Sequence, residues 1–166
     1  MMISKTMNEK LNEQVMHELH AALVYLDLSC PFSEMGLNVF AEWFRHHAME
    51  ERQHAMKIFS YIHEVGGTVK MSAIPAPPKR PSSTEDIVKL ALEHELLVTR
   101  QINDLMALAE KESDYATRSF LQWFVDEQVE EVAVVNELLQ LMKLADGKNL
   151  LQVESRVAKM LEREGS

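Results

Sequence analysis

Glu50-Glu51-Arg52-Gln53-His54 is the stretch from which the fold and the chemistry can be worked out. Glu51 and His54 lie three positions apart, so on a helix their side chains share one face. That face continues in both directions at alternating steps of three and four residues, through Phe40, Phe44, His47, Ile58, Tyr61 and Val65. The period is typical of a helix packed into a bundle. A carboxylate and an imidazole are therefore expected to point into the core, although His54 alone could be a core histidine satisfied by a hydrogen bond.

The length and composition of the chain limit the classes of protein to which it can belong. At 166 residues the chain can bury the core of one domain without disulfides. The single cysteine, Cys30, cannot form an internal disulfide, and it excludes a four-cysteine iron or zinc site within one chain. The formal net charge of -9 argues against nucleic acid or an anionic membrane as the main partner and favours cations. Without a recognisable secretory leader or membrane-spanning apolar run, we expect a soluble, cytoplasmic protein.

The periodic pattern predicts four long helices and one short one, over about residues 4–33, 37–65, 83–111, 115–145 and 149–162. Pro31 and Met35-Gly36 are expected to close the first helix and Gly66-Gly67 the second, because proline lacks a backbone donor and glycine tolerates a left-handed C-terminal turn. Ser82 and Glu85 are expected to form a capping box at the start of the third helix.

The connections between these helices predict the topology. The breaks near residues 33–36 and 112–114 are too short to cross a bundle, so each joins antiparallel neighbours. The proline-rich segment 66–82, extended at about 3.3 Å per residue, can reach roughly 50 Å and so run the length of a helix. The second and third helices can then be parallel. We predict an all-α fold: one ferritin-like four-helix bundle over residues 1–166, with a long crossover and a short fifth C-terminal helix.

Acidic residues interrupt the apolar face of every long helix near its middle, at Glu18, Glu51, Glu95, Glu127 and Glu131. A bundle brings these positions into one layer together with His54. An isolated carboxylate taken out of water costs several kcal/mol, so five would rival a total stability of about 5–15 kcal/mol. The carboxyls must be protonated, face water or surround a cation, and bound metal is the economical explanation.

Ligand chemistry narrows the choice of metal. Carboxylate oxygens with one histidine suit iron or manganese better than structural zinc or magnesium. One Glu from each of two helices with Glu-x-x-His from the other two is the pattern of di-metal carboxylate bundles. Here only one Glu-x-x-His is complete, since Glu127-Gln128-Val129-Glu130 carries glutamate where the second histidine would be.

Motifs along nearly the whole chain carry a family resemblance. They are Glu9-Lys10-Leu11-Asn12-Glu13-Gln14, Glu50-Glu51 with His54, His94-Glu95, Phe120-Leu121-Gln122-Trp123-Phe124, and Glu127-Gln128 with Glu130-Glu131. As a set they resemble prokaryotic non-haem ferritins. The resemblance implies iron storage and detoxification by a ferroxidase, which oxidises Fe(II) with O2 or H2O2 at a di-iron centre and passes Fe(III) to a mineral inside a protein cage.

The same resemblance implies roles for individual residues. Glu18, Glu51 and His54 would hold the first iron. Glu51 would bridge to a second iron that Glu95 and Glu131 also hold.

A third iron is implied beside this pair. Glu50, Glu127 and Glu130 would hold it together with Glu131, and Gln128 would contact the pair through water.

Aromatic and histidine side chains complete the expected site. Tyr25 matches a tyrosine beside the family's centre, a one-electron donor that can at the same time be a core phenol hydrogen-bonded to a carboxylate. Trp123 is expected to pack. Four histidines are expected to be surface or core residues, with help in iron access as the alternative: His17, His46, His47 and His94.

No haem is expected, because Arg52 and Gln53 occupy the positions where bacterioferritins carry the haem methionine. The resemblance further implies a homo-oligomeric shell of about 24 copies, with the fifth helix near a symmetry axis. A non-storing di-iron oxidase or peroxidase is the alternative function. A metal-free structural bundle would leave the layer of acids unexplained.

Overall fold

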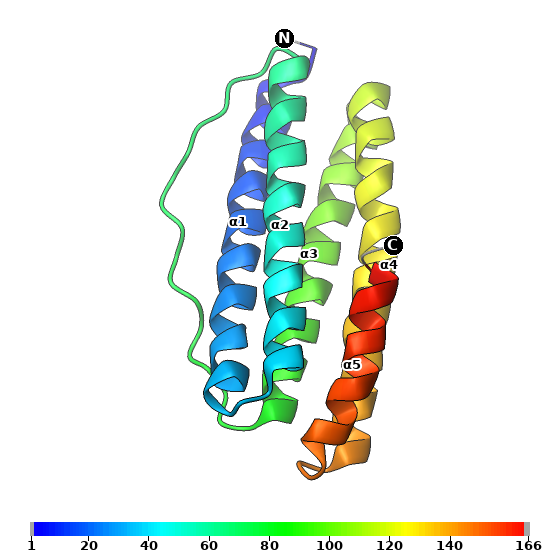
Figure 1. Cartoon of the computed structure of the whole chain (residues 1–166). Helices are drawn as coiled ribbons and strands as arrows, with labels where there is room; N and C mark the ends of the chain where they lie inside the picture. Colours follow the sequence, from blue (N-terminus) through cyan, green and yellow to red (C-terminus); the bar gives the residue numbers. More distant parts are fainter. Residues whose placement is uncertain (1, 165–166) are drawn as a thin grey trace.

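The computed structural model describes residues 2–164, and within that range the chain forms five α-helices and no strand. They are α1 (Lys5–Glu34), α2 (Asn38–Glu64), α3 (Thr84–Lys111), α4 (Tyr115–Ala145) and α5 (Leu150–Glu164). The first four form a bundle, and α5 lies against its side (Figure 1). The predicted all-α fold class is confirmed.

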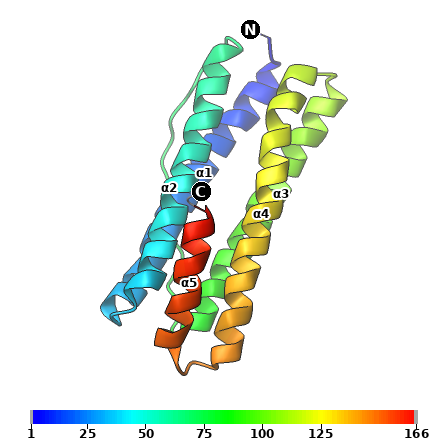
Figure 2. The ribbon, with the colours of Figure 1, turned by 45° about the vertical axis from the view of Figure 1, so that its right-hand side comes forward.

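The order of the helices in space follows from their connections. Short turns make α1 antiparallel to α2 and α3 antiparallel to α4, whereas the crossover runs down the outside of α1 and leaves α2 parallel to α3 (Figure 1). After α4 the chain turns back, so that α5 lies along α2 and α4 and ends near mid-bundle (Figure 2). No helix among the described residues combines the length and apolar character that a membrane span requires.

Side chains cap three of the helix N-termini. The hydroxyl of Ser4 accepts the backbone N–H of Met7 in α1, and Asp114 accepts that of Thr117 in α4. In α3 the cap is Ser83, which accepts the N–H of Asp86 at 3.1 Å.

The predicted capping box of Ser82 and Glu85 is therefore wrong by one residue. Ser83 and Asp86 follow the same spacing one position later. The hydroxyl of Ser83 also donates to the Asp86 carboxylate at 2.7 Å, an added contact between these two residues.

The predicted end of α1 is confirmed at Met35-Gly36, which directly follow the helix, but Pro31 does not close it and lies inside its last turn. Proline removes only its own N–H donor, and its carbonyl still accepts the N–H of Met35 at 3.1 Å. The helix stops at Glu34, and the chain turns at Gly36, whose φ of 76° favours glycine.

The core of the bundle is divided into two apolar clusters. The cluster near the α1–α2 turn is rich in aromatic rings, including Phe32, Phe40 and Phe44, and it also receives Val157 and Met160 of α5. The cluster at the other end lies between residues 3–15 and 58–65 on one side and 98–109 and 121–124 on the other. Between the clusters lies a layer of buried polar side chains: Glu18, Glu51, His54, Glu95, Gln128 and Glu131.

Candidate metal centre

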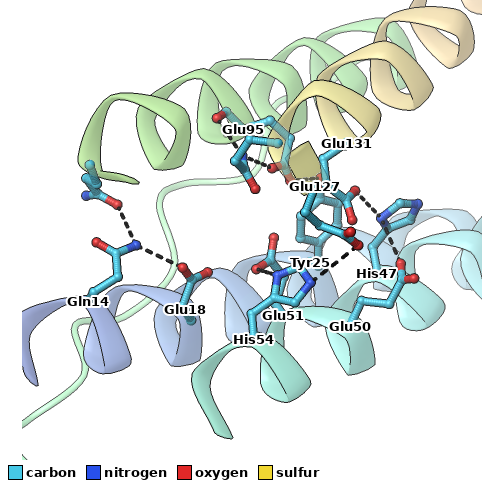
Figure 3. Close-up of polar contacts among 12 residues, drawn as sticks. Gln14, Glu18, Tyr25, His47, Glu50, Glu51, His54, Glu95, Glu127 and Glu131 are labelled. Atoms are coloured by element: carbon cyan, nitrogen blue, oxygen red, sulfur yellow. Dashed lines mark hydrogen bonds and ion pairs between the residues drawn. The ribbon is translucent and has the colours of Figure 1, made fainter. Parts of the chain in front are cut away.

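The buried polar layer is built from all four long helices (Figure 3). α1 contributes Glu18 and Tyr25, and α3 contributes Glu95. The remaining side chains of the layer come from α2 and α4: His47, Glu50, Glu51 and His54, then Glu127, Gln128 and Glu131. Periodicity placed most of these residues at one level, and the bundle brings them together there.

Glu18, Glu51 and His54 form the most enclosed group. Their ligand atoms all lie within 4.8 Å of one another, and all three side chains are buried. His54 Nδ1 is 3.2 Å from Glu51 Oε2, and Gln14 donates to Glu18 Oε1 at 2.8 Å. Glu18 Oε2 is buried without a hydrogen-bond partner among residues 2–164. A buried oxygen left open in this way suits a cation, because an unpaired polar atom in the interior is costly.

Glu95 faces the same layer from the opposite helix and is held by two donors. The Tyr25 hydroxyl donates to its Oε1 at 2.5 Å, and the Gln128 amide donates to its Oε2 at 3.2 Å. Gln128 is thus fixed against Glu95 and its backbone carbonyl. In the described structure Glu95 belongs to none of the compact groups of three ligand atoms that the other acids form.

His47 lies on the other side of the layer, between carboxylates. Its Nδ1 is 3.2 Å from Glu131 Oε2 and 3.4 Å from Glu50 Oε2, and its Nε2 is 3.5 Å from Glu164 Oε2. The ring stacks on Tyr25 with centroids 5.4 Å apart. From the sequence, His47 was expected to be a surface or core histidine, with help in iron access as the alternative; its place on the same helical face as Glu51 was the available signal.

The buried face of α4 agrees with the prediction at Glu131 and differs from it by one position at Glu127. Phe124, Gln128, Glu131 and Val135 are buried, whereas Glu127 is only half-buried. Two overlapping series of residues fit a buried face of α4. The predicted series places Glu127 between Phe124 and Glu131, whereas the observed series has Gln128 there.

Glu127 and Glu130 consequently lie at the rim. Glu127 Oε1 is 3.8 Å from His54 Nε2, and its carboxylate forms a compact group with His54 and Glu131. Glu130 is exposed and joins no such group in residues 2–164. Trp123 packs edge-on against the His54 ring, with centroids 5.5 Å apart, and lies beneath Lys57.

In the metal-free layer, burial raises the pKa values of several carboxyl groups. Burial raises the pKa of Glu51 well above its usual range, and the charges of Glu95 and Glu18 add to it. The pKa of Glu95 rises to about 7, through burial and the charge of Glu131, and that of Glu50 rises to about 7 through burial. Protons therefore occupy part of this layer at neutral pH when no cation is bound.

His47 and Glu131 shift in the opposite sense and act as an ion pair. Burial lowers the pKa of His47, but its contacts with Glu131 and Glu164 outweigh this and raise it to about 10. Burial raises the pKa of Glu131, but the hydrogen bond and charge of His47 bring it below its ordinary value. His47 thus supplies a positive charge to the layer in the metal-free protein.

The donor set defines what the layer can bind. Several carboxylates with one or two imidazoles suit iron or manganese, and the absence of cysteine among the residues of this layer disfavours a thiolate site. Adjacent groups that share Glu131 allow more than one ion to bind close together.

Comparisons with known proteins agree with the fold. A family model described as the ferritin-like domain matches residues 8–145. A bacterial non-heme ferritin of Staphylococcus aureus is 38% identical over 151 residues, covering 90% of this chain and 91% of that protein. A probable bacterial non-heme ferritin-like protein of Haemophilus influenzae is 34% identical over 155 residues, covering 92% and 94%.

Solved structures give the same result. The open pore ferritin of the archaeon Archaeoglobus fulgidus matches with a TM-score of 0.91 and 37% identity, covering 94% of this chain and 96% of that one. A Chlorobium tepidum ferritin matches with a TM-score of 0.84 and 38% identity, covering 95% and 98%. The family model spans most of the chain, and the relatives exceed 30% identity over nearly their whole length. The chain therefore belongs to the ferritin family.

Proposed function

We propose that this protein is an iron-storage ferroxidase, which oxidises Fe(II) with O2 or H2O2 at the buried polar layer and deposits Fe(III) as a mineral. The observation that carries the proposal is the layer of carboxylates with His54 between two apolar clusters. Such a layer is costly without a cation and suits iron in its donor set. Membership of the ferritin family and relatives named bacterial non-heme ferritin support the same conclusion.

Within this proposal two Fe(II) ions bind as substrates at the most buried acids. Glu18, Glu51 and His54 hold the first, since their ligand atoms converge within 4.8 Å. Glu51 bridges to the second, for which Glu95 and Glu131 are the further ligands. Both of these carboxylates are buried in the same layer (Figure 3).

A third Fe(II) binds at the rim of the layer. Glu131 holds it together with Glu50 and Glu127, because Glu131 forms one compact group of ligand atoms with Glu50 and a second with Glu127. Glu130 is exposed and does not hold this iron; its negative charge attracts incoming cations to the rim.

The protein contributes binding, orientation and proton handling to the reaction. Each Fe(II) gives up one electron, and O2 takes two electrons and two protons to become H2O2. The carboxyls that carry protons in the metal-free layer, Glu50 and Glu95, release them when iron binds. Reduction of O2 to water instead takes four electrons: three Fe(II) ions supply three, Tyr25 can supply the fourth, and Glu95 Oε1, which already accepts its hydrogen bond, takes the phenol proton.

The stored mineral requires a closed container, so we propose a homo-oligomeric shell of about 24 copies. Exposed apolar side chains support an interface between copies on the α1 side of the bundle. They include Leu23 and Leu26 of α1 and Met71 and Ile74 of the crossover.

Rapid-mixing kinetics test the oxidation directly. The wild-type protein mixed with Fe(II) in air should form Fe(III) at least about tenfold faster than the Glu51→Gln variant, because this variant weakens both proposed iron positions. Equal rates in the two proteins would remove the layer from the reaction.

A further inference from the structure

The fifth helix is fixed in place along the bundle at both ends of its contact with α2. Near its start, Glu154 Oε1 accepts the backbone N–H of Val39 at 2.7 Å and that of Phe40 at 3.3 Å. These groups belong to the first turn of α2, whose N-cap residue in the described structure provides no side-chain hydrogen bond of its own. Val157 and Met160 are buried in the adjoining apolar cluster. The register of α5 against α2 is therefore determined by specific contacts.

Its far end brings a carboxylate to the polar layer. Glu164 lies ten residues beyond Glu154, about 15 Å along the helix. Its Oε2 is 3.5 Å from His47 Nε2, and its side chain is 14% exposed. Both carboxylate oxygens of Glu164 are buried without a hydrogen-bond partner in the part of the chain that the structure describes, as is His47 Nε2.

The two nitrogens of His47 face different groups. Nδ1 faces Glu50 and Glu131, at 3.4 and 3.2 Å, which belong to the proposed third iron position. Nε2 faces only the carboxylate of α5 among these acids. The ring is 2% exposed and held flat against Tyr25, so it has little freedom to turn away.

The geometry that makes His47 an ion-pair partner in the metal-free protein also suits a metal ligand, since Nδ1 and the oxygens of Glu50 and Glu131 form a compact group of ligand atoms. Donor atoms bound to one transition-metal ion at about 2.1 Å lie roughly 3.0–3.4 Å from one another. The Nδ1 distances to Glu50 and Glu131 fall in that range, beyond the usual length of a charge-assisted hydrogen bond. A histidine that ligates a metal commonly donates its other ring N–H to a carboxylate, which fixes the tautomer.

We infer that His47 Nδ1 is a ligand of the third iron, and that Glu164 acts as its positioning residue by accepting the Nε2 hydrogen. This inference rests on the proposed function of the layer as an iron site. Its consequence is a linkage between the docking of α5 and the affinity of one particular iron position. When α5 is released, the tautomer of His47 is no longer fixed and the third iron binds more weakly.

The test is an anaerobic calorimetric titration of the whole protein with Fe(II), which measures binding without oxidation. The wild type should bind three Fe(II) per chain. His47→Gln should lose one of them, and Glu164→Ala should weaken the same one by about 10–100-fold. Glu164→Gln keeps an acceptor oxygen and should restore part of that affinity.

Two further variants distinguish the effect of releasing α5 from the effect of removing one acidic charge. Glu154→Ala removes the contact that holds α5 to the start of α2 and should weaken the third iron without altering any ligand. Glu110→Gln is the matched control: it removes one acidic charge and an exposed ion pair, with Arg118, that does not involve α5, and it should leave all three affinities unchanged.

The outcomes are distinguishable. Three sites of unaltered affinity in His47→Gln, or in both Glu164→Ala and Glu154→Ala, would overturn the inference while leaving the proposed function standing. A wild type that binds no Fe(II) would overturn the proposed function itself, and one that binds only two would remove the third site and this inference with it.

Discussion

The Tyr25 hydroxyl donates to Glu95 Oε1 at 2.5 Å, joining α1 to α3 across the polar layer. This contact places a redox-capable phenol directly on a proposed iron ligand. Its proton has an acceptor in place, so loss of an electron from the ring does not require the chain to rearrange.

Replacing Tyr25 with phenylalanine separates the redox role of the ring from its packing role. The ring contacts with Phe44 and His47 remain, while Glu95 Oε1 loses its donor. We expect oligomer size to be unchanged, the metal-free protein to lose about 1–3 kcal/mol of stability, and the radical signal after mixing with Fe(II) and O2 to disappear. Freeze-quenched electron paramagnetic resonance measures the radical, and loss of assembly instead would make Tyr25 a structural residue.

Replacing Glu131 with alanine should slow Fe(II) oxidation by more than about tenfold. Glu131 is a proposed ligand of the second iron and also forms compact groups of ligand atoms with Glu50 and with Glu127 at the third position, so its loss affects both positions. Stopped-flow absorbance in air measures the rate. The matched control is Glu137→Gln, an exposed acid on the same helix, which should keep the wild-type rate. A Glu131→Ala protein as fast as the wild type would exclude this residue from the centre.

The metal-free protein should become less stable as the pH rises from 5 to 8. Glu50 and Glu95 have folded-state pKa values of about 7, above the ordinary 4.5, so the folded state holds protons that the unfolded chain has released. Their contribution is fully present below pH 4.5 and is lost as the pH rises through 7.

His47 acts in the same direction, since its pKa of about 10 gives stability that is present below pH 6.5 and lost as the pH rises through 10. Scanning calorimetry of the metal-free protein should show a falling Tm over this range, and Zn(II), a probe that does not oxidise, should reverse the trend. A Tm that rises with pH in the metal-free protein would contradict the assignment.

The start of the crossover should be sensitive to the size of residue 67. Asn8 Oδ1 accepts the backbone N–H of Thr68 at 2.9 Å, and a Cβ added at Gly67 would collide with this side chain and with Ile62. We expect Gly67→Ala to lower the free energy of unfolding by about 1–3 kcal/mol, measured by urea denaturation. Gly36→Ala provides a comparison, because its Cβ would meet no atom of the described chain and only its φ of 76° would oppose it.

Periodicity predicted the helices because each long one has a continuous buried face, and the expected and observed helix ends differ by at most two residues. It also placed Glu18, Glu51, His54 and Glu95 in one layer, since a residue near the middle of a helix stays at mid-level whichever way that helix runs.

The features that were missed depend on local competition or on distant contacts. Glu127 and Gln128 are adjacent, and each lies at the spacing of a series of apolar residues on α4. Only packing against the other helices determines which of the two is buried. The environment of His47 depends on Glu164, which is 117 positions away and reaches it only because α5 turns back along α2. The spacing of residues within one helix cannot predict a contact with a distant helix.

The most direct test of the central claim is the iron retained per chain after a large excess of Fe(II) is added in air and the protein is separated by size. If the protein stores iron, far more than three soluble iron atoms per chain should elute with a particle much larger than one chain. Two or three atoms per chain on a small oligomer would contradict storage and indicate a di-iron oxidase or peroxidase. No retained iron would contradict both.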